Sequence, residues 1–303
     1  MNKNSILIIG GTGFIGFHLV KSCIKKKWDI TCVSTKVPTI KRRVKKVKYI
    51  LADISNKNQL KKKLKSNYKY IVNLGGYVDH KNKIKVYKSH YIGCKNLFEV
   101  FKNKELNTFV QIGSSSEYGK NISPMKESFL CEPKSIYGKS KLLATNFLLE
   151  KNKKKNFPAI ILRLFQAYGP HQDKNRLIPI VIDGCIKDTK FGCSPGKQFR
   201  DFIYIDDVIR AILNSLNNKN ALGNIINVGA QKPKKIKSVI KKIRSIIKSG
   251  SPQFGKIKMR RDEILNIYPN ISKAKKLLKW KPKISFNIGL RKTISYYLKY
   301  AQK

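Results

Sequence analysis

Residues 5–16 read Ser5-Ile6-Leu7-Ile8-Ile9-Gly10-Gly11-Thr12-Gly13-Phe14-Ile15-Gly16, and this stretch decides the fold. An apolar run is broken by glycines, and apolar residues then return at helical spacing at Ile15, Leu19, Val20, Cys23 and Ile24. The pattern predicts a buried parallel strand, a tight turn and the beginning of a helix.

The three spaced glycines, Gly10, Gly13 and Gly16, have separate physical roles. One permits the turn, one lets backbone N–H groups approach a pyrophosphate, and one lets the helix pack against its strand. The N–H groups at the helix start, at Phe14 and Ile15, would attract the anion together with the helix dipole. A glycine turn can also be a purely structural connector, but the strand before it and the helix after it favour dinucleotide binding.

Length and composition fit one large α/β domain, with or without a smaller lobe. The chain has 303 residues, of which 41% are hydrophobic, enough for a substantial core. We find no apolar run of about 18 residues and no cationic leader, so we expect a cytoplasmic protein without membrane association. The six cysteines lack metal-like spacing, and we expect reduced structural thiols and no metal site.

The formal net charge of +48 raises the question of a nucleic-acid partner. The lysines are spread over nearly every predicted helix and loop, as in Lys61-Lys62-Lys63, and aromatic residues are not interleaved with them. We therefore expect no specific nucleic-acid partner. The positive field should still attract anionic substrates and make their binding depend on salt.

Further strands alternate with helices along the first half of the chain. They are predicted at 29–34, 47–52, 70–74, 109–112 and 159–164, with a long helix at about 83–102. This alternation predicts a Rossmann-type, doubly wound parallel sheet whose ligands bind beyond the carboxyl ends of the strands. We assign 1–165 to a dinucleotide-binding domain, with contributions from about 200–230, and most of 166–303 to a substrate-binding lobe.

The residue that ends the second strand usually selects the dinucleotide, because an acid there accepts from the adenosine ribose. Here the residue is Ser34, which removes repulsion against a 2′-phosphate and favours NADP(H) over NAD(H). Asp53 either meets the adenine edge or caps the next helix. The predicted cofactor contacts outside the glycine turn are Ser34, Lys36, Asp53, Ile54, Leu74 and Gly75.

The candidate catalytic residues are Ser114, Tyr137 and Lys141, the last two also being cofactor contacts. Ser114 follows the fifth predicted strand, and the tyrosine and lysine lie four apart on one face of the following helix. Two further Tyr-x-x-x-Lys matches, Tyr77/Lys81 and Tyr91/Lys95, are expected by chance in so lysine-rich a chain. Only the match at 137–141 follows a serine loop and begins a helix, so its context selects it.

A neighbouring lysine can make a tyrosine a better base. On its own, a phenol has a pKa near 10 and is a poor base at neutral pH. An ammonium about 4 Å away at an effective dielectric of 20 favours the phenolate by about 4 kcal/mol. Lys141 could therefore tune Tyr137 and also bond the nicotinamide ribose, while Ser114 holds the substrate oxygen. The alternative is an interfacial tyrosine beside a solvated lysine.

At these residues the chain resembles the extended short-chain dehydrogenase/reductase family, the NAD(P)-dependent epimerase/dehydratase group acting on nucleotide sugars. The resemblance covers nearly the whole chain. It is carried by the glycine turn, Ser114, Tyr137/Lys141, Tyr168-Gly169-Pro170, Arg200-Asp201-Phe202 and Lys279-Trp280-Lys281-Pro282.

The resemblance implies hydride exchange between nicotinamide and a sugar carbon, with Tyr137 as acid and base. It also implies that Ser115, Arg200 and Arg260 bind the substrate, the two arginines at its diphosphate. Related dehydratases carry a Glu where this chain has Ser116, and Glu117 would point elsewhere, which disfavours a 4,6-dehydratase. His90 and Gln166 stand where the family often has Asn.

We therefore expect an NADPH-dependent reductase of a nucleotide-linked 4-keto-deoxysugar that serves surface-polysaccharide synthesis. The alternative is a nucleotide-sugar epimerase with tightly bound NAD. A 4,6-dehydratase or a non-catalytic dinucleotide-binding protein is a weaker alternative. Relatives commonly dimerise through helices that include the Tyr137 segment, so a homodimer is possible.

Overall fold

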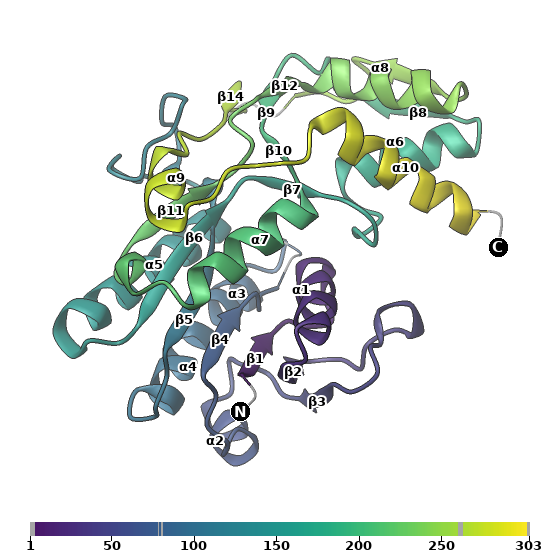
Figure 1. Cartoon of the computed structure of the whole chain (residues 1–303). Coiled ribbons are helices and arrows are strands. Elements are labelled where there is room, and N and C mark those ends of the chain that lie inside the picture. Colours follow the sequence, from purple (N-terminus) through teal and green to yellow (C-terminus); the bar gives the residue numbers. More distant parts are fainter. Residues whose placement is uncertain (1–3, 78, 80, 260–262, 302–303) are drawn as a thin grey trace.

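A central parallel sheet organises the chain. The computed structural model describes residues 4–77, 79, 81–259 and 263–301. Within them seven strands form a sheet in the order β11-β6-β5-β4-β1-β2-β3 (Figure 1). The strands are β1 (Ser5–Ile9), β2 (Asp29–Ser34), β3 (Lys48–Leu51), β4 (Tyr70–Asn73), β5 (Thr108–Ser114), β6 (Ala159–Leu164) and β11 (Ile225–Val228). The predicted doubly wound sheet is confirmed, and its strand order reverses between β1 and β4.

Strand β1 shows why this sheet needs helices on both faces. Its side chains alternate, so that Ile6 and Ile8 belong to one buried cluster while Leu7 and Ile9 belong to another. Helices α1 (Phe14–Lys25) and α7 (Ile205–Leu216) contribute to the first cluster. Helices α4 (Gly93–Phe101) and α5 (Ile136–Lys155) contribute to the second, as does the short α2 (Lys57–Lys63).

The long helix predicted at about 83–102 is interrupted. It consists of α3 (Lys83–Tyr87), a π-helical turn η2 (Lys88–Ile92) and α4. The turn carries His90, which is buried against the segment that follows β4. A Cβ atom at Gly76 would lie 1.8 Å from His90 Cε1, so this imidazole is packed against bare backbone. Sequence periodicity did not reveal the extra residue, because the apolar pattern continues on both sides of it.

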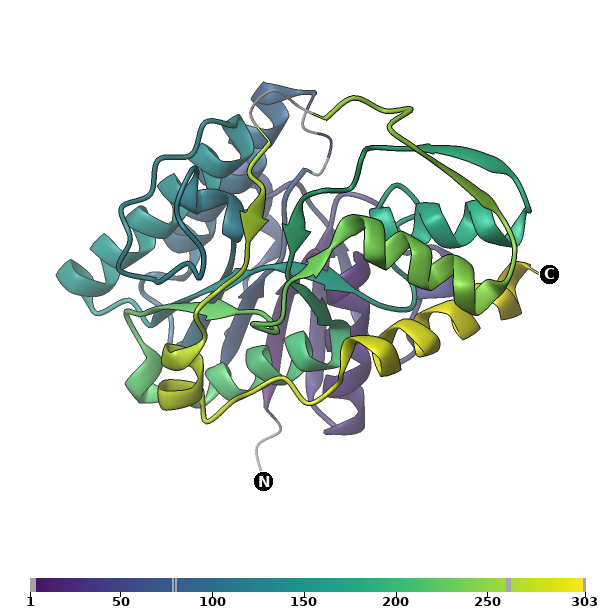
Figure 2. The same cartoon turned by 90° about the horizontal axis from the view of Figure 1, so that it is seen from above.

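The second half of the chain builds a lobe on the carboxyl side of the sheet (Figures 1 and 2). Small sheets join β7 (Gln166–Tyr168) to β10 (Phe202–Tyr204), β8 (Lys190–Cys193) to β13 (Ser251–Phe254), and β9 (Phe199–Arg200) to β12 (Lys234–Lys235) and β14 (Asn266–Ile267). The lobe's helices are α6 (Leu177–Ile186), α8 (Ile236–Ile247) and α10 (Phe286–Ala301). Helix α9 (Ser272–Leu278) returns to pack on β11 and α7.

An acidic residue near the start of α7 anchors the C-terminal segment. Among the described residues, no side chain caps α7 at Tyr204. Asp207 in the first turn is fully buried, accepts the N–H groups of Lys283 and Ile284 and pairs with Arg210. The carboxylate thus bonds the tail and Arg210, and not the N–H groups at the start of its own helix. No helix in the described part of the chain is long and apolar enough to cross a membrane.

A histidine next to the lobe makes stability depend on pH. His171 has a left-handed backbone (φ +63°), and its Nδ1 lies 3.0 Å from the hydroxyl of Tyr296. Burial, followed by the charges of His18 and Lys21, lowers the pKa of His171 from 6.5 to about 4. On acidification the unfolded chain therefore binds this proton first, and stability is lost as pH falls from 6.5 to about 4.

We expect His171→Asn to reduce this acid sensitivity. Asn tolerates the left-handed backbone, and it does not titrate. Between pH 6.5 and about 4, the unfolding free energy of the parent should fall by up to about 1.4 kcal/mol more per pH unit than that of the variant. Urea unfolding at pH 7, 6 and 5 measures this slope. An identical slope in both proteins would contradict the assignment.

Candidate active site

We call the glycine turn, residues 10–16, the glycine cradle; side chains added at Gly10 or Gly16 would meet backbone atoms. Gly10 has φ +76°, a conformation that favours glycine, and its carbonyl accepts the N–H of Gly13 at 3.0 Å. A Cβ atom at Gly16 would lie 2.3 Å from Gly10 O. Gly13 is the N-cap of α1, and in the described residues no side chain satisfies this helix end. The cradle therefore fits the pyrophosphate of a dinucleotide.

Strand β2 ends at Ser34, where the absence of an acid favours NADP(H). Ser34 Oγ donates to the carbonyl of Lys36 at 2.7 Å, which holds the two residues in a tight turn. Of the basic residues further on, Arg42 donates to the carbonyl of His171 and to the carboxylate of Asp173, at 2.6 and 2.7 Å. Arg42 also donates to the carbonyl of Thr12 at 3.3 Å, so it lies between the glycine turn and the lobe. The missing acid at residue 34 remains the main argument on cofactor choice.

Asp53 does not cap the next helix. Asn56 caps α2 by accepting the N–H of Gln59, while Asp53 accepts the N–H of Ser55 at 2.8 Å. The capping alternative is wrong, because the helix begins at Lys57, four residues after Asp53, and Asn56 is its N-cap. A polar depression of about 520 Å³ opens here between the start of α2 and η2, and Asp53 lines it.

The end of β4 lies directly against the glycine turn. A Cβ atom at Gly10 would be 3.1 Å from the backbone of Leu74, and Gly75 donates its N–H to Asn73 at 3.1 Å. Ile54 packs nearby, since a Cβ at Gly75 would lie 3.0 Å from its Cδ1. The predicted cofactor contacts of β1, β4 and the segment after β3 are thus brought together.

Tyr137 and Lys141 lie on the first turns of α5, where Ser135 caps the helix by accepting the N–H of Gly138. Lys141 is 4% exposed; its Nζ donates to the carbonyl of Ile112 at 2.7 Å and lies 5.9 Å from the centroid of the Tyr137 ring. The lysine is therefore fixed between β5 and the tyrosine.

Two contacts connect Tyr137 to the segment that follows β4. Its ring meets His90 edge-on, with centroids 5.1 Å apart. His90 in turn packs against Gly76, which follows the part of β4 that touches the glycine turn. The competing match Tyr91/Lys95 instead has its tyrosine ring packed against Phe147 of α5, with centroids 6.5 Å apart.

Ser114 ends β5 and begins the short helix η3 (Ser115–Tyr118) as its N-cap. Its Oγ accepts the N–H of Ser116 at 3.1 Å, and Ser115 is half-buried. A Cβ at Gly138 would lie 2.5 Å from Ser116 O, so this loop is packed flush against the start of α5. Ser114 and Tyr137 therefore come from two segments in direct backbone contact.

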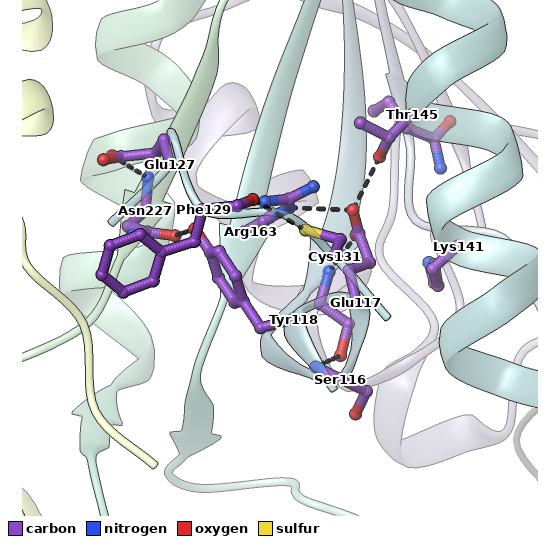
Figure 3. Close-up of polar contacts among 12 residues, drawn as sticks. Ser116, Glu117, Tyr118, Glu127, Phe129, Cys131, Lys141, Thr145, Arg163 and Asn227 are labelled. Atoms are coloured by element: carbon purple, nitrogen blue, oxygen red, sulfur yellow. Dashed lines mark hydrogen bonds and ion pairs between the residues drawn. The ribbon is translucent and has the colours of Figure 1, made fainter. Parts of the chain in front are cut away.

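Glu117 points inward, as expected. Its side chain is fully buried, and its Oε1 accepts the N–H of Ser114 at 2.7 Å. Its Oε2 accepts from Thr145 Oγ1 at 2.9 Å and from Arg163 Nε at 2.8 Å (Figure 3). A carboxylate held in this way cannot reach a sugar at the surface of the site.

The hydrogen bonds of Glu117 with Thr145 and Arg163 were not predicted from the sequence. The pattern Ser114-x-x-Glu117 is that of a capping box, and the structure contains both of its hydrogen bonds. This signal could have identified the inward carboxylate.

Arg200 lies on β9 at the base of the lobe. Its guanidinium donates to the carbonyls of Phe199 and Leu265 and pairs with Glu263. Arg260, the other predicted phosphate ligand, lies outside the described residues. Burial raises the pKa of the neighbouring Asp201 to about 6, although it accepts the N–H groups of Ala230 and Lys232.

Metal chemistry has no visible ligand set in this part of the chain. Among the described residues, no three His, Cys, Asp or Glu side chains gather as they would around a metal ion.

Comparisons with known proteins identify the family. A sequence model described as the NAD dependent epimerase/dehydratase family matches residues 6–229. A Methanocaldococcus jannaschii protein assigned as a UDP-glucose 4-epimerase is 29% identical, over 96% of this chain and 97% of its own. The UDP-N-acetyl-alpha-D-glucosaminuronate decarboxylase of Bacillus cytotoxicus is 25% identical, over 97% and 98% of the two chains.

A solved structure of a nucleotide-sugar epimerase is also similar to this chain. The UDP-glucuronic acid 4-epimerase of Bacillus cereus, in complex with UDP-glucuronic acid and NAD, is 27% identical with a TM-score of 0.85. The match covers 97% of this chain and 99% of that one. The chain therefore belongs to the NAD dependent epimerase/dehydratase family, the extended short-chain dehydrogenase/reductases that act on nucleotide sugars.

Proposed function

We propose that the protein exchanges a hydride with one carbon of a nucleotide-linked sugar, using Ser114, Tyr137 and Lys141. The observation that carries this proposal is their convergence at the carboxyl edge of the sheet, where Tyr137 is connected through His90 and Gly76 to the glycine cradle. A binding protein has no need of a phenol held against a buried ammonium, so the site favours catalysis over simple dinucleotide sensing.

A bound nicotinamide dinucleotide supplies or accepts the hydride, and the residues of this chain handle the proton and the orientation. Tyr137 transfers a proton to or from the sugar oxygen as general acid or base. Ser114 holds that oxygen, and the Lys141 ammonium stabilises negative charge on the phenol. Ser115 and Arg200 would contact the substrate, with the guanidinium at its diphosphate. Most of the remaining substrate contacts would come from residues 166–303.

The missing acid at the end of β2 supports a preference for NADP(H), and hence a reductase of a 4-keto-deoxysugar. A reductase must release its oxidised cofactor after each turnover, whereas an epimerase re-reduces the same carbon. Glu117 supports neither dehydration nor acid chemistry at the sugar, because it is fully buried and paired. A 4,6-dehydratase is therefore disfavoured.

The second candidate is a nucleotide-sugar epimerase with resident NAD. The observation in its favour is the similarity to epimerases, one of which is solved with NAD. The purified protein distinguishes the two. Exchangeable cofactor and oxidation of NADPH by 4-keto-6-deoxy sugars linked to UDP or dTDP would support the reductase. Retained NAD and conversion of UDP-glucose or UDP-glucuronic acid without added cofactor would overturn it in favour of the epimerase.

Ser34→Asp tests the cofactor preference. A carboxylate facing a 2′-phosphate should repel it, and we expect kcat/KM for NADPH to fall by about 10- to 100-fold while that for NADH does not fall. Steady-state kinetics with both dinucleotides measures the ratio. Ser245→Asp, on the exposed side of α8, makes the same change in net charge away from the site. Equal losses for both dinucleotides, or none, would contradict the preference.

A further inference from the structure

We propose that Glu117 is a positioning residue: its buried carboxylate sets the place of Ser114 relative to Tyr137 without touching the substrate. This inference rests on the proposed function for the two catalytic residues. Glu117 is fully buried, whereas Ser116 before it is exposed, so the chain turns this one acid inward.

The carboxylate joins the three elements that surround the reacting groups. Oε1 accepts the backbone N–H of Ser114 itself, at 2.7 Å. Oε2 accepts from Thr145 on α5, one helical turn beyond Lys141, and from Arg163 on β6 (Figure 3). One side chain thus connects β5, α5 and β6. A shift of the carboxylate would move the serine and the catalytic helix relative to each other.

The buried cation explains why a charged residue is needed here. Arg163 is 1% exposed, its guanidinium carbon lies 4.5 Å from the centroid of the Tyr118 ring, and in the described residues its Nη1 has no hydrogen-bond partner. Glu117 is its ion-pair partner, so removing the carboxylate alone would leave a buried charge uncompensated. A useful test must therefore separate the ion pair from the hydrogen bond to Ser114.

Two double variants achieve this separation. In Glu117→Gln/Arg163→Met both charges are gone, but the amide oxygen can still accept from Ser114, and its N–H can donate to the Thr145 hydroxyl. In Glu117→Met/Arg163→Met the volume is similar, but the bond to Ser114 is lost. The two proteins therefore differ in the hydrogen bonds of residue 117 to Ser114 and Thr145, and carry the same charge.

We expect the Gln/Met protein to keep the parental kcat and the Met/Met protein to lose about 10- to 100-fold, because small misplacements at a reacting centre cost this much. The substrate is whichever panel sugar the parent converts, with UDP-glucuronic acid tried first. Dinucleotide Kd should be unchanged in both. Amide hydrogen exchange of residues 113–118 should accelerate in the Met/Met protein, and it needs no substrate. Equal kcat and equal exchange in the two folded proteins would overturn the proposal.

Glu117→Gln alone provides a second comparison should the Met/Met protein not fold. The amide N–H would face the Arg163 guanidinium, and we expect kcat to fall and to be restored by adding Arg163→Met. A low kcat that Arg163→Met leaves unchanged would overturn the proposal. Asp207→Asn controls for stability, because that carboxylate is equally buried and paired with an arginine, and is hydrogen-bonded to the C-terminal segment. It should lower Tm but not kcat.

Failure of this proposal is distinguishable from failure of the proposed function. Ser114→Ala and Tyr137→Phe test the catalytic roles directly. If they abolish turnover while the two double variants are alike, only the positioning role of Glu117 is refuted. If they leave turnover unchanged, the catalytic roles themselves are wrong.

Discussion

Tyr137→Phe is expected to lower kcat by about 10²- to 10⁴-fold, the range for removal of a general acid or base. The substitution deletes the hydroxyl and keeps the ring that packs edge-on against His90 at 5.1 Å. Lys141 keeps its bond to the carbonyl of Ile112, so the helix start and the neighbouring strand should not move. Dinucleotide affinity and Tm should stay near the parental values. The measurement is turnover of the sugar that the parent converts, under saturating cofactor.

Tyr91→Phe is the matched control, because Tyr91 also precedes a lysine by four residues. The Lys95 ammonium lies 5.5 Å from its ring centroid, a contact much like that of Lys141 with Tyr137 at 5.9 Å. Tyr91 packs on Phe147 away from the glycine cradle, and its loss of a hydroxyl should leave kcat unchanged. A Tyr137→Phe enzyme that turns over as fast as Tyr91→Phe would rule out the phenol as the proton donor and acceptor.

The glycine turn was predictable because its determinants are local. The alternation of Ile6 to Ile9 between two buried clusters follows from a strand covered on both faces. Gly13 and Gly16 are required by close backbone contacts within a few residues, at Gly10 and Gly11. The selection of one among three tyrosine–lysine pairs rests on chain order, since the pair at 137–141 follows β5 and begins α5; it stays a prediction.

The parts that could not be predicted depend on partners far away in sequence. Glu117 finds Thr145 and Arg163 across 28 and 46 residues, and no local pattern names either partner. Asp207 leaves the start of its own helix uncapped by its side chain because the tail at Lys283 offers it a backbone N–H group 76 residues away. For Asp207, burial against the tail outweighed the local capping preference, whereas Glu117 keeps its capping bond to Ser114 and gains two distant partners in addition.

The π turn at Lys88–Ile92 is a third example of this kind. A helical hydrophobic pattern passes through it, and the interruption is associated with the packing of His90 against Gly76 and Tyr137. Because both contacts come from other elements, the position of the break follows from the site and not from the helix's own sequence.

Gly16→Ala is expected to weaken dinucleotide binding by about 100-fold or more, which is about 2.7 kcal/mol. An added Cβ would lie 2.3 Å from Gly10 O and 2.6 Å from the Cα of Gly11, and both are backbone atoms that cannot rotate away. Helix α1 must then move away from β1. Because the proposed pyrophosphate site uses the N–H groups at this helix start, that displacement would separate the donors from the anion.

Gly192→Ala separates this local effect from a general loss of stability. There an added Cβ meets the side chain of Ile257 at 3.3 Å, and that contact can relax by a small rotation on the far side of the lobe. Its dinucleotide Kd should equal that of the parent in a fluorescence titration, whereas Gly16→Ala should require far more ligand at the same folded fraction. If the two alanine variants bound the dinucleotide equally well, the contact between α1 and the glycine turn would not form the pyrophosphate cradle, and the cofactor site would have to lie elsewhere on the sheet edge.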